Sequence, residues 1–170
     1  MIKKILKLVL PNFFLKIYKN LSLKIERNKF SKMTTKKVFK KIYEKKLWSP
    51  EVEKKKFKFY SGSGSHNKDF SEKYINEVSK FLITFENKPD VVDLGCGDFI
   101  IGSKLRKFCN KYVAIDIFDD LIDYNKKIYN DLNVEFKVRD ITEDELPSGE
   151  ICFVKDVLQH LSNDLIKKFI

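Results

Sequence analysis

The segment VVDLGCGDFIIG, residues 91–102, joins an apolar run, a turn with two glycines and a second apolar run. This order is typical of a buried strand that enters a tight turn and opens a helix. Gly95 and Gly97 let the backbone approach a ligand closely, and the helix start offers N–H dipoles to its anionic end. Asp93 would repel a pyrophosphate, so the motif favours a ligand that also carries a cationic group such as an amine.

Short apolar strands alternate with helical patterns around this motif. The predicted strands are 91–94, 112–115, 134–138 and 151–154, and the predicted helices are 70–85, 99–108, 118–132 and one that begins near Leu161. Such alternation predicts an α/β fold with a Rossmann-like parallel sheet and flanking helices. Four of an expected seven strands are visible, so we expect a C-terminally truncated copy or a fragment of a longer protein.

Positive charge is concentrated at the start of the chain. Residues 1–60 hold 19 Lys/Arg and 4 Asp/Glu, a net of +15, whereas residues 61–170 hold 15 and 20, a net of −5. We expect three parts: a basic amphipathic helical arm (1–35), a helix with a Ser/Gly-rich lead-in loop (36–69) and a cofactor-binding half-domain (70–170). The arm could lie on an anionic membrane surface, pack on the domain or a partner, or be a solvated surface.

Several classes of protein are disfavoured by composition. The three cysteines, Cys96, Cys109 and Cys152, are far apart and form no CxxC pair, so we expect buried reduced thiols and no metal. No run of about 18 uncharged apolar residues predicts a membrane span. Lysines interrupt the apolar start and no small-residue cleavage site follows, so a secretory signal is not predicted, and we expect a cytoplasmic location.

The sequence from Asp93 to Gly97, DLGCG, resembles the first motif of class I S-adenosylmethionine-dependent methyltransferases, and the resemblance runs from residue 91 to 170. It implies S-adenosylmethionine as the cofactor. It also implies that Asp93 orients the methionine amino group, directly or through water. The glycine turn, Gly95, Cys96 and Gly97, would line the methionine moiety.

The resemblance extends to the ends of the next two strands. Asp116, which closes YVAID, is expected with Ile117 at the ribose, where one carboxylate can accept from two hydroxyls. Asp140 and Ile141 are expected at the adenine. The alternatives are that Asp116 only caps the following helix and that Asp140 only closes a turn.

The segment VKDVLQHL, residues 154–161, follows the fourth predicted strand. Ligands of open α/β sheets bind outside such strand ends. We expect Lys155 beside the cofactor, with Asp156 and Gln159 at the same edge. His160 is the candidate general base, because an imidazole titrates near working pH, although it could instead cap the helix or line the cofactor pocket.

A closer similarity lies upstream of the motif. VFKKIYEKKLW followed by YSGSGS resembles a bacterial methyltransferase group with an F-x-x-I-Y…W…S-G-x-G-S lead-in, which covers residue 38 to the C-terminus. The resemblance implies that the loop folds over the cofactor, with Ser61, Gly62, Ser63 and Gly64 near its methionine end. A flexible linker is the alternative for this stretch.

The predicted function is therefore methyl transfer from S-adenosylmethionine to an unknown acceptor. A glycan or another membrane-proximal small molecule is the expected acceptor, with the protein held at the inner face of the membrane through residues 1–30. An RNA-binding or RNA-methylating protein is the first alternative, which the lack of glycine-arginine repeats disfavours. A non-catalytic remnant with a membrane- or partner-binding helix is the second.

Overall fold

A computed structural model describes residues 33–169 of the chain. The chain divides into two compact units, Met1–Val38 and Phe39–Ile170. Of the first unit the structure describes only 33–38, so the predicted arm lies almost wholly outside the described residues, and the predicted boundaries at 35 and 69 stay predictions. The sheet, its helices and the candidate site belong to the second unit.

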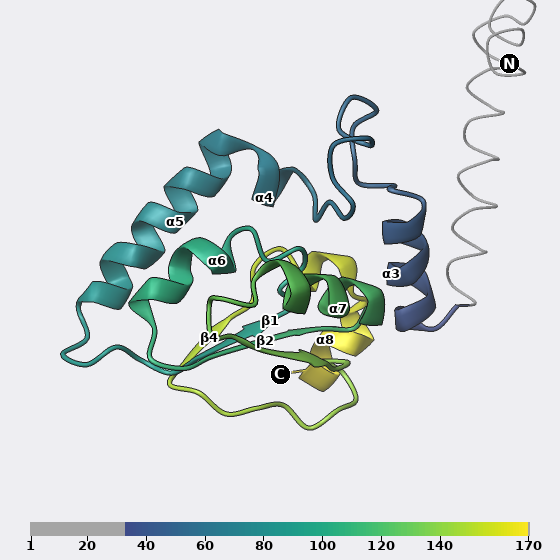
Figure 1. The fold of residues 1–170 in the computed structure, drawn as a ribbon. Coiled ribbons are helices and arrows are strands. Elements are labelled where there is room, and N and C mark those ends of the chain that lie inside the picture. Colours follow the sequence, from purple (N-terminus) through teal and green to yellow (C-terminus); the bar gives the residue numbers. More distant parts are fainter. Residues whose placement is uncertain (1–32, 170) are drawn as a thin grey trace, which may run out of the picture. The chain divides into compact units, whose positions relative to one another are not determined.

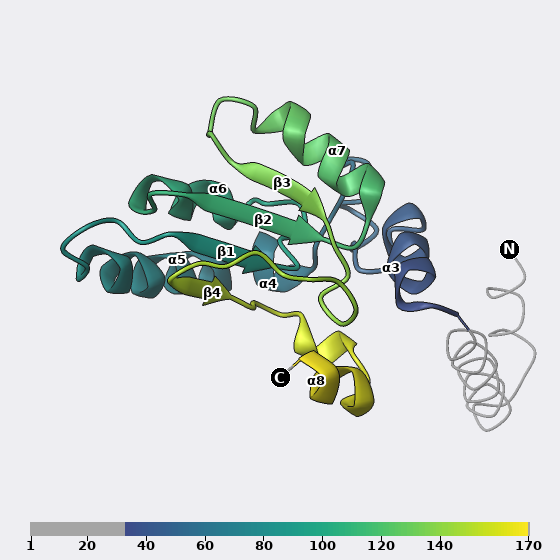
Figure 2. The ribbon, with the colours of Figure 1, turned by 90° about the horizontal axis from the view of Figure 1, so that it is seen from below.

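Four parallel strands form one sheet, as the alternating pattern predicted. The order across the sheet is β3-β2-β1-β4 (Figures 1 and 2). The strands are β1 (Val91–Leu94), β2 (Tyr112–Asp116), β3 (Glu135–Val138) and β4 (Ile151–Phe153). All four residues of β1 are buried, because the strand is central and covered on both faces, which explains its nearly continuous apolar sequence.

One face of the sheet carries three helices: α5 (Lys68–Ile83), α6 (Gly102–Leu105) and α7 (Asp119–Ile128) (Figure 1). Their buried side chains meet alternate strand residues in the main core, which comprises Leu82, Val91, Phe99, Leu105, Cys109, Tyr112, Ala114, Ile122, Phe136 and Phe153. The period-2 alternation of the strands decides which side chains reach these helices.

The other face is covered by the segment between β3 and β4 and by α8 (Asn163–Phe169). Val92, Leu94 and Ile115 form a second core there, against side chains of the covering segments such as Leu146 and Phe169. Cys152, beside Val92 in the register, is exposed. The prediction that all three cysteines are buried is therefore wrong for Cys152, because β4 is the last strand on its side of the described sheet.

Helix boundaries differ from the sequence pattern in several places. Helix α3 runs Thr35–Glu44 and so begins one residue before the predicted part 36–69, and a short helix α4 (Ser63–His66) lies inside the predicted Ser/Gly-rich loop. The predicted helix over 99–108 begins only at Gly102 and ends in the 3-10 turn Arg106–Phe108, whereas α7 is shorter than predicted. A second 3-10 turn, Leu158–His160, precedes α8.

No helix in residues 33–169 combines the length and apolar character that a membrane span needs. Within the same residues no cluster of His, Cys, Asp or Glu side chains has the geometry of a metal site.

Candidate functional site

The glycine turn after β1 is shaped by two left-handed residues. Gly95 has φ 77° and Gly97 has φ 57°, a region that side-chain-bearing residues rarely adopt. The N–H groups of Gly95 and Cys96 donate to the Ile115 carbonyl at 2.9 and 2.8 Å, which fixes the turn at the end of β2. Both glycines are also crowded: a Cβ on Gly97 would lie 2.4 Å from Ser61 Oγ, and one on Gly95 would lie 2.6 Å from a Val157 methyl group.

Phe99 lies between the glycine turn and α6. Its backbone is left-handed, with φ 60°, and its ring is fully buried among Tyr112, Tyr129 and Phe136. The left-handed residue delays the helix until Gly102. A Cβ on Gly102 would lie 2.2 Å from the Phe99 ring, so the later glycine makes room for that ring.

Asp93 is a buried acid at the end of the central strand. Its Oδ2 accepts a hydrogen bond from the Tyr112 hydroxyl at 2.9 Å. Burial raises the pKa of Asp93 to about 7, although the Tyr112 hydrogen bond and the charge of Lys155 both lower it. Near neutral pH this carboxyl is therefore balanced between its two protonation states, and a cationic group placed beside it would shift the balance to the carboxylate.

Asp116 is held by the backbone at the end of β2. Its Oδ2 accepts from the Gly97 N–H and its Oδ1 from the Phe118 N–H, both at 3.1 Å. Burial raises the pKa of Asp116 to about 6, and these backbone hydrogen bonds oppose the rise. The carboxylate thus ties the glycine turn to the end of the neighbouring strand.

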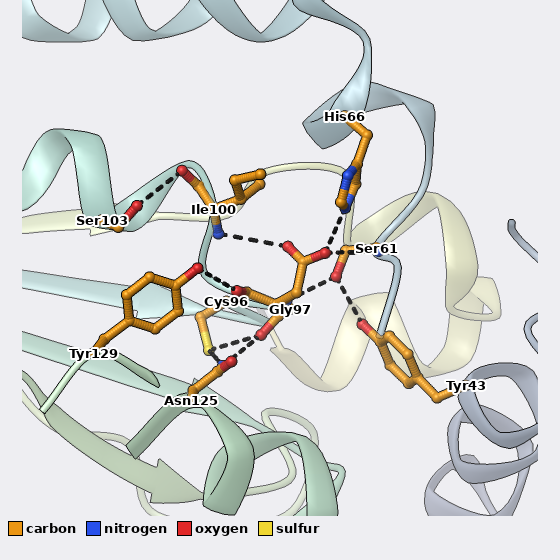
Figure 3. A network of polar contacts seen from close by, with 10 residues as sticks. Tyr43, Ser61, His66, Cys96, Gly97, Ile100, Ser103, Asn125 and Tyr129 are labelled. Carbon is orange, nitrogen blue, oxygen red and sulfur yellow. Dashed lines mark hydrogen bonds and ion pairs between the residues drawn. The ribbon is translucent and has the colours of Figure 1, made fainter. Parts of the chain in front are cut away.

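A polar network that the sequence analysis missed surrounds the turn (Figure 3). Asp98 accepts from the His66 ring, with 2.5 Å between Oδ2 and Nε2, and from the Ser61 N–H at 3.2 Å. The Asn125 side chain, fully buried on α7, donates to the Gly97 carbonyl at 2.7 Å. The half-buried Cys96 lies beside Asn125, and burial raises the pKa of its thiol. The sequence signal that could have revealed this network is Asp98, the acid after the second glycine in DLGCGD.

Asp140 and Ile141 point to different surroundings. The half-buried Asp140 uses its Oδ1 to accept from the Thr142 N–H at 2.9 Å and the Thr142 hydroxyl at 2.6 Å, which closes a turn. Ile141 packs on the second core, beneath the sheet. None of these contacts joins them to Asp93 or Asp116, so their role at the adenine stays a prediction, as does that of the half-buried Ile117.

A pocket of about 550 Å³ opens beside the end of β4. It is lined by Ser61, Gly62, Ser63, Lys155 and His160 from the predicted site, with Gly64, Asp156 and Gln159, and by three aromatic residues that the sequence analysis did not assign, Trp48, Phe70 and Tyr74. Asp93, Asp116, Asp140 and the glycine turn do not line it. The structure therefore separates the predicted residues into two sets. The strand-end group consists of Asp93, Asp116 and the glycine turn, and the pocket group consists of the residues that line the pocket.

Lys155 and Asp156 give this pocket balanced charge. The Lys155 ammonium pairs with the Asp156 carboxylate, donates to the Gly64 carbonyl at 3.1 Å and lies 5.3 Å from the centre of the Tyr74 ring. Asp156 has φ 57°, a left-handed conformation that is uncommon outside glycine and that often marks functional positions.

His160 lies at the pocket against Trp48, with 4.8 Å between ring centres. Burial lowers the pKa of His160, and the charge of Asp156 opposes this. The imidazole is therefore neutral near pH 7, which is the form that accepts a proton.

Methyltransferases are among the solved structures to which this chain is similar. A phosphoethanolamine N-methyltransferase of Haemonchus contortus is 15% identical, with a TM-score of 0.46, over 60% of this chain and 28% of that one. A TehB-like S-adenosylmethionine-dependent methyltransferase of Corynebacterium glutamicum is 21% identical, with a TM-score of 0.45 (62% and 63%). Magnesium protoporphyrin IX methyltransferase of Synechocystis PCC 6803 is 19% identical, with a TM-score of 0.47 (57% and 51%).

The chain spans less than two thirds of the length of each of these structures. No protein-family model and no curated protein sequence matches it. The assignment of a Rossmann-like α/β fold rests on the parallel sheet and its helices.

Proposed function

We propose that the chain is the cofactor-binding half of an S-adenosylmethionine-dependent methyltransferase. One observation carries the proposal: a buried carboxylate, Asp93, ends the central strand directly before a left-handed glycine turn that a second carboxylate, Asp116, holds from the next strand. An acid close to a backbone turn suits an amino-acid ammonium group, and an acid on the neighbouring strand suits a ribose.

The residues present fit such a cofactor. A carboxylate has about four acceptor positions. The Tyr112 hydroxyl uses one on Asp93, and the backbone N–H groups of Gly97 and Phe118 use two on Asp116. Both acids therefore keep acceptor capacity for an ammonium group and for ribose hydroxyls.

When bound, S-adenosylmethionine supplies a methyl group already activated by its sulfonium. The protein then has to bind, orient and exclude water. Asp93 binds the ammonium group as a carboxylate, and Asp116 orients the nucleoside. Ser61 covers Gly97 and helps to exclude water from the turn. His160, neutral near pH 7, is placed to accept the proton of a hydroxyl or amine acceptor.

The pocket beside β4 is the proposed acceptor site. Its aromatic side chains, Trp48, Phe70 and Tyr74, offer flat apolar surfaces, and its one ammonium group is already paired with Asp156. Such a lining suits an uncharged ring with hydroxyl groups, which agrees with a glycan acceptor. A membrane-proximal acceptor rests on residues 1–30, which lie outside the described residues; flotation of the full chain with anionic liposomes tests it.

Isothermal titration calorimetry of the purified chain with S-adenosylmethionine and S-adenosylhomocysteine tests the proposed cofactor. We expect both to bind and ATP, which has the nucleoside but no amino acid, to bind at least about 100-fold more weakly. Asp93→Asn should weaken this binding. Asp90→Asn is its matched control, because Asp90 lies at the opposite end of β1 and accepts hydrogen bonds from Asn110 and Lys111. A folded chain that binds neither compound contradicts the proposal.

A further inference from the structure

Residues 60–66, here called the roof segment, lie directly on the glycine turn. The Ser61 side chain and the Gly97 backbone are so close that a Cβ on Gly97 would be 2.9 Å from Ser61 Cβ. The same segment contributes Ser61, Gly62, Ser63 and Gly64 to the lining of the pocket. The roof segment therefore reaches both the strand-end group and the pocket group.

Asp98 fastens the roof segment to the turn through reciprocal hydrogen bonds. The Asp98 N–H donates to Ser61 Oγ at 2.7 Å, and the Ser61 N–H donates back to Asp98 Oδ2 at 3.2 Å. Ser61 Oγ also lies 3.2 Å from the Tyr43 hydroxyl. The two Ser61–Asp98 hydrogen bonds join residues 37 apart in the sequence, so they connect two loops that no local structure holds together.

His66 completes this attachment from the other end of the roof segment. Its Nε2 is 2.5 Å from Asp98 Oδ2, and the side chains of the pair are only 6% and 9% exposed. The His66 ring stacks on Tyr60, with 4.0 Å between ring centres and 17° between planes, and meets the edge of Phe57 at 4.5 Å. Removing one member of a buried polar pair leaves the other without that hydrogen bond, which costs free energy. Loss of His66 should therefore weaken the attachment of the roof segment.

A second attachment lies at Gly64. Lys155, from the segment after β4, donates to the Gly64 carbonyl, and a Cβ on Gly64 would overlap the Asp156 carboxylate. Between the two attachments Gly62 has φ 94°, and a Cβ there would meet no atom within 4 Å. The roof segment is thus attached at Ser61, Gly64 and His66 and is uncrowded at Gly62.

We infer that His66 and Asp98 are positioning residues that fasten the roof segment over the glycine turn and so set the rate at which the cofactor dissociates. The inference rests on the proposed function for the identity of the cofactor. Neither side chain is proposed to contact the cofactor or lines the pocket, so their effect on the cofactor passes through Ser61 and its neighbours.

Amide hydrogen exchange and cofactor dissociation test this inference in the full chain. His66→Ala should speed exchange of the amides of 61–66 by roughly tenfold while β1 and β2 keep their protection. It should also speed dissociation of S-adenosylhomocysteine by roughly tenfold, measured by stopped-flow displacement of a fluorescent S-adenosylhomocysteine analogue. His66→Gln, whose amide can donate to Asp98, should restore most of both effects.

Asp90→Asn is the control, since it removes an aspartate that accepts two hydrogen bonds far from the roof segment. Exchange and dissociation of His66→Ala that stay within about twofold of the unmodified chain overturn the inference, as does a rise in exchange spread evenly over the sheet. If His66→Ala does not fold, His66→Gln and Ser61→Ala are compared in the same way. If the unmodified chain binds no cofactor, the proposed function fails, and the exchange data alone decide whether His66 fastens the segment.

Discussion

The two groups of site residues differ in how their polar atoms are satisfied. At the ends of β1 and β2, Asp93 and Asp116 are less than 10% exposed and are held by Tyr112 and by backbone N–H groups. At the end of β4, the polar side chains face an open pocket, and the Asp156 carboxylate pairs with its neighbour Lys155. The first group is therefore fixed by the fold, whereas the second is free to meet a ligand.

This difference matches two different tasks. A site that always binds the same cofactor gains affinity from groups that are already oriented, because little conformational entropy is then lost on binding. A site for an acceptor needs side chains that can be exchanged without disturbing the sheet, and loop side chains after a strand satisfy that need. The comparison predicts that substitutions in the strand-end group disturb cofactor binding and that substitutions in the pocket group outside the roof segment do not.

Gly97→Ala should have the largest effect. The new Cβ would meet Ser61 Oγ at 2.4 Å on a backbone with φ 57°. We expect the dissociation constant for S-adenosylmethionine to rise at least about 100-fold, and the free energy of unfolding to fall by roughly 1–3 kcal/mol, by calorimetry and by urea titration. Gly62→Ala is the matched control, because it carries the backbone strain without the crowding. Equal effects of the two substitutions would show that the roof segment does not press on the turn.

Asp93→Asn should come second, with affinity for S-adenosylmethionine reduced by roughly 10- to 100-fold at pH 8, since a hydrogen bond to a charged group is lost. In the unmodified chain, affinity should rise with pH through about 7, the pKa of Asp93, because the protonated acid cannot pair with an ammonium group. The variant should lose this dependence. Calorimetry across that range checks both expectations, and an unchanged pH profile in the variant would remove Asp93 from the proposed site.

Tyr112→Phe should shift the same profile without abolishing binding. The Tyr112 hydroxyl donates to Asp93 and lowers its pKa, so removal of this donor should raise the midpoint of the pH dependence. At pH 8 the affinity should fall by less than roughly tenfold. A midpoint that does not rise would mean that the Tyr112 hydroxyl does not lower the pKa of Asp93.

His160→Gln should change cofactor affinity by less than about threefold, because His160 belongs to the pocket group and faces Trp48 rather than the strand-end acids. Calorimetry with S-adenosylhomocysteine measures this. A loss above roughly tenfold would join the two groups into a single cofactor site and would favour the alternative that His160 lines the cofactor pocket.

The cysteines should give the smallest effect. Cys152 is exposed on β4, whereas Cys109 is buried and its pKa is raised to about 11. Iodoacetamide should therefore modify Cys152 first, and Cys109 only on unfolding, as mass spectrometry of digested protein would show. Cys152→Ser should leave cofactor affinity within about twofold. Faster modification of Cys109 would mean that the main core opens readily.

Particular residues show how far the sequence could lead. The run Val91–Leu94 predicted a buried central strand, and Gly95 and Gly97 predicted a tight turn, because both signals are local. The late start of α6 was not predictable, since it depends on where the Phe99 ring finds space in the core. Asp140 shows the opposite problem: its place after a strand is visible in the sequence, but its turn with Thr142 is a matter of side-chain geometry.

The sequence by itself determined the alternation of strands and helices, hence the parallel sheet, because hydrophobic periodicity and glycine turns act over a few residues. Only the tertiary structure decided that His66 and Ser61 meet Asp98, that Trp48 and Phe70 share a pocket with Lys155, and that Cys152 is exposed. These contacts join segments 30 or more residues apart or depend on an edge of the sheet. Packing of the whole domain fixes them, and no local pattern records it.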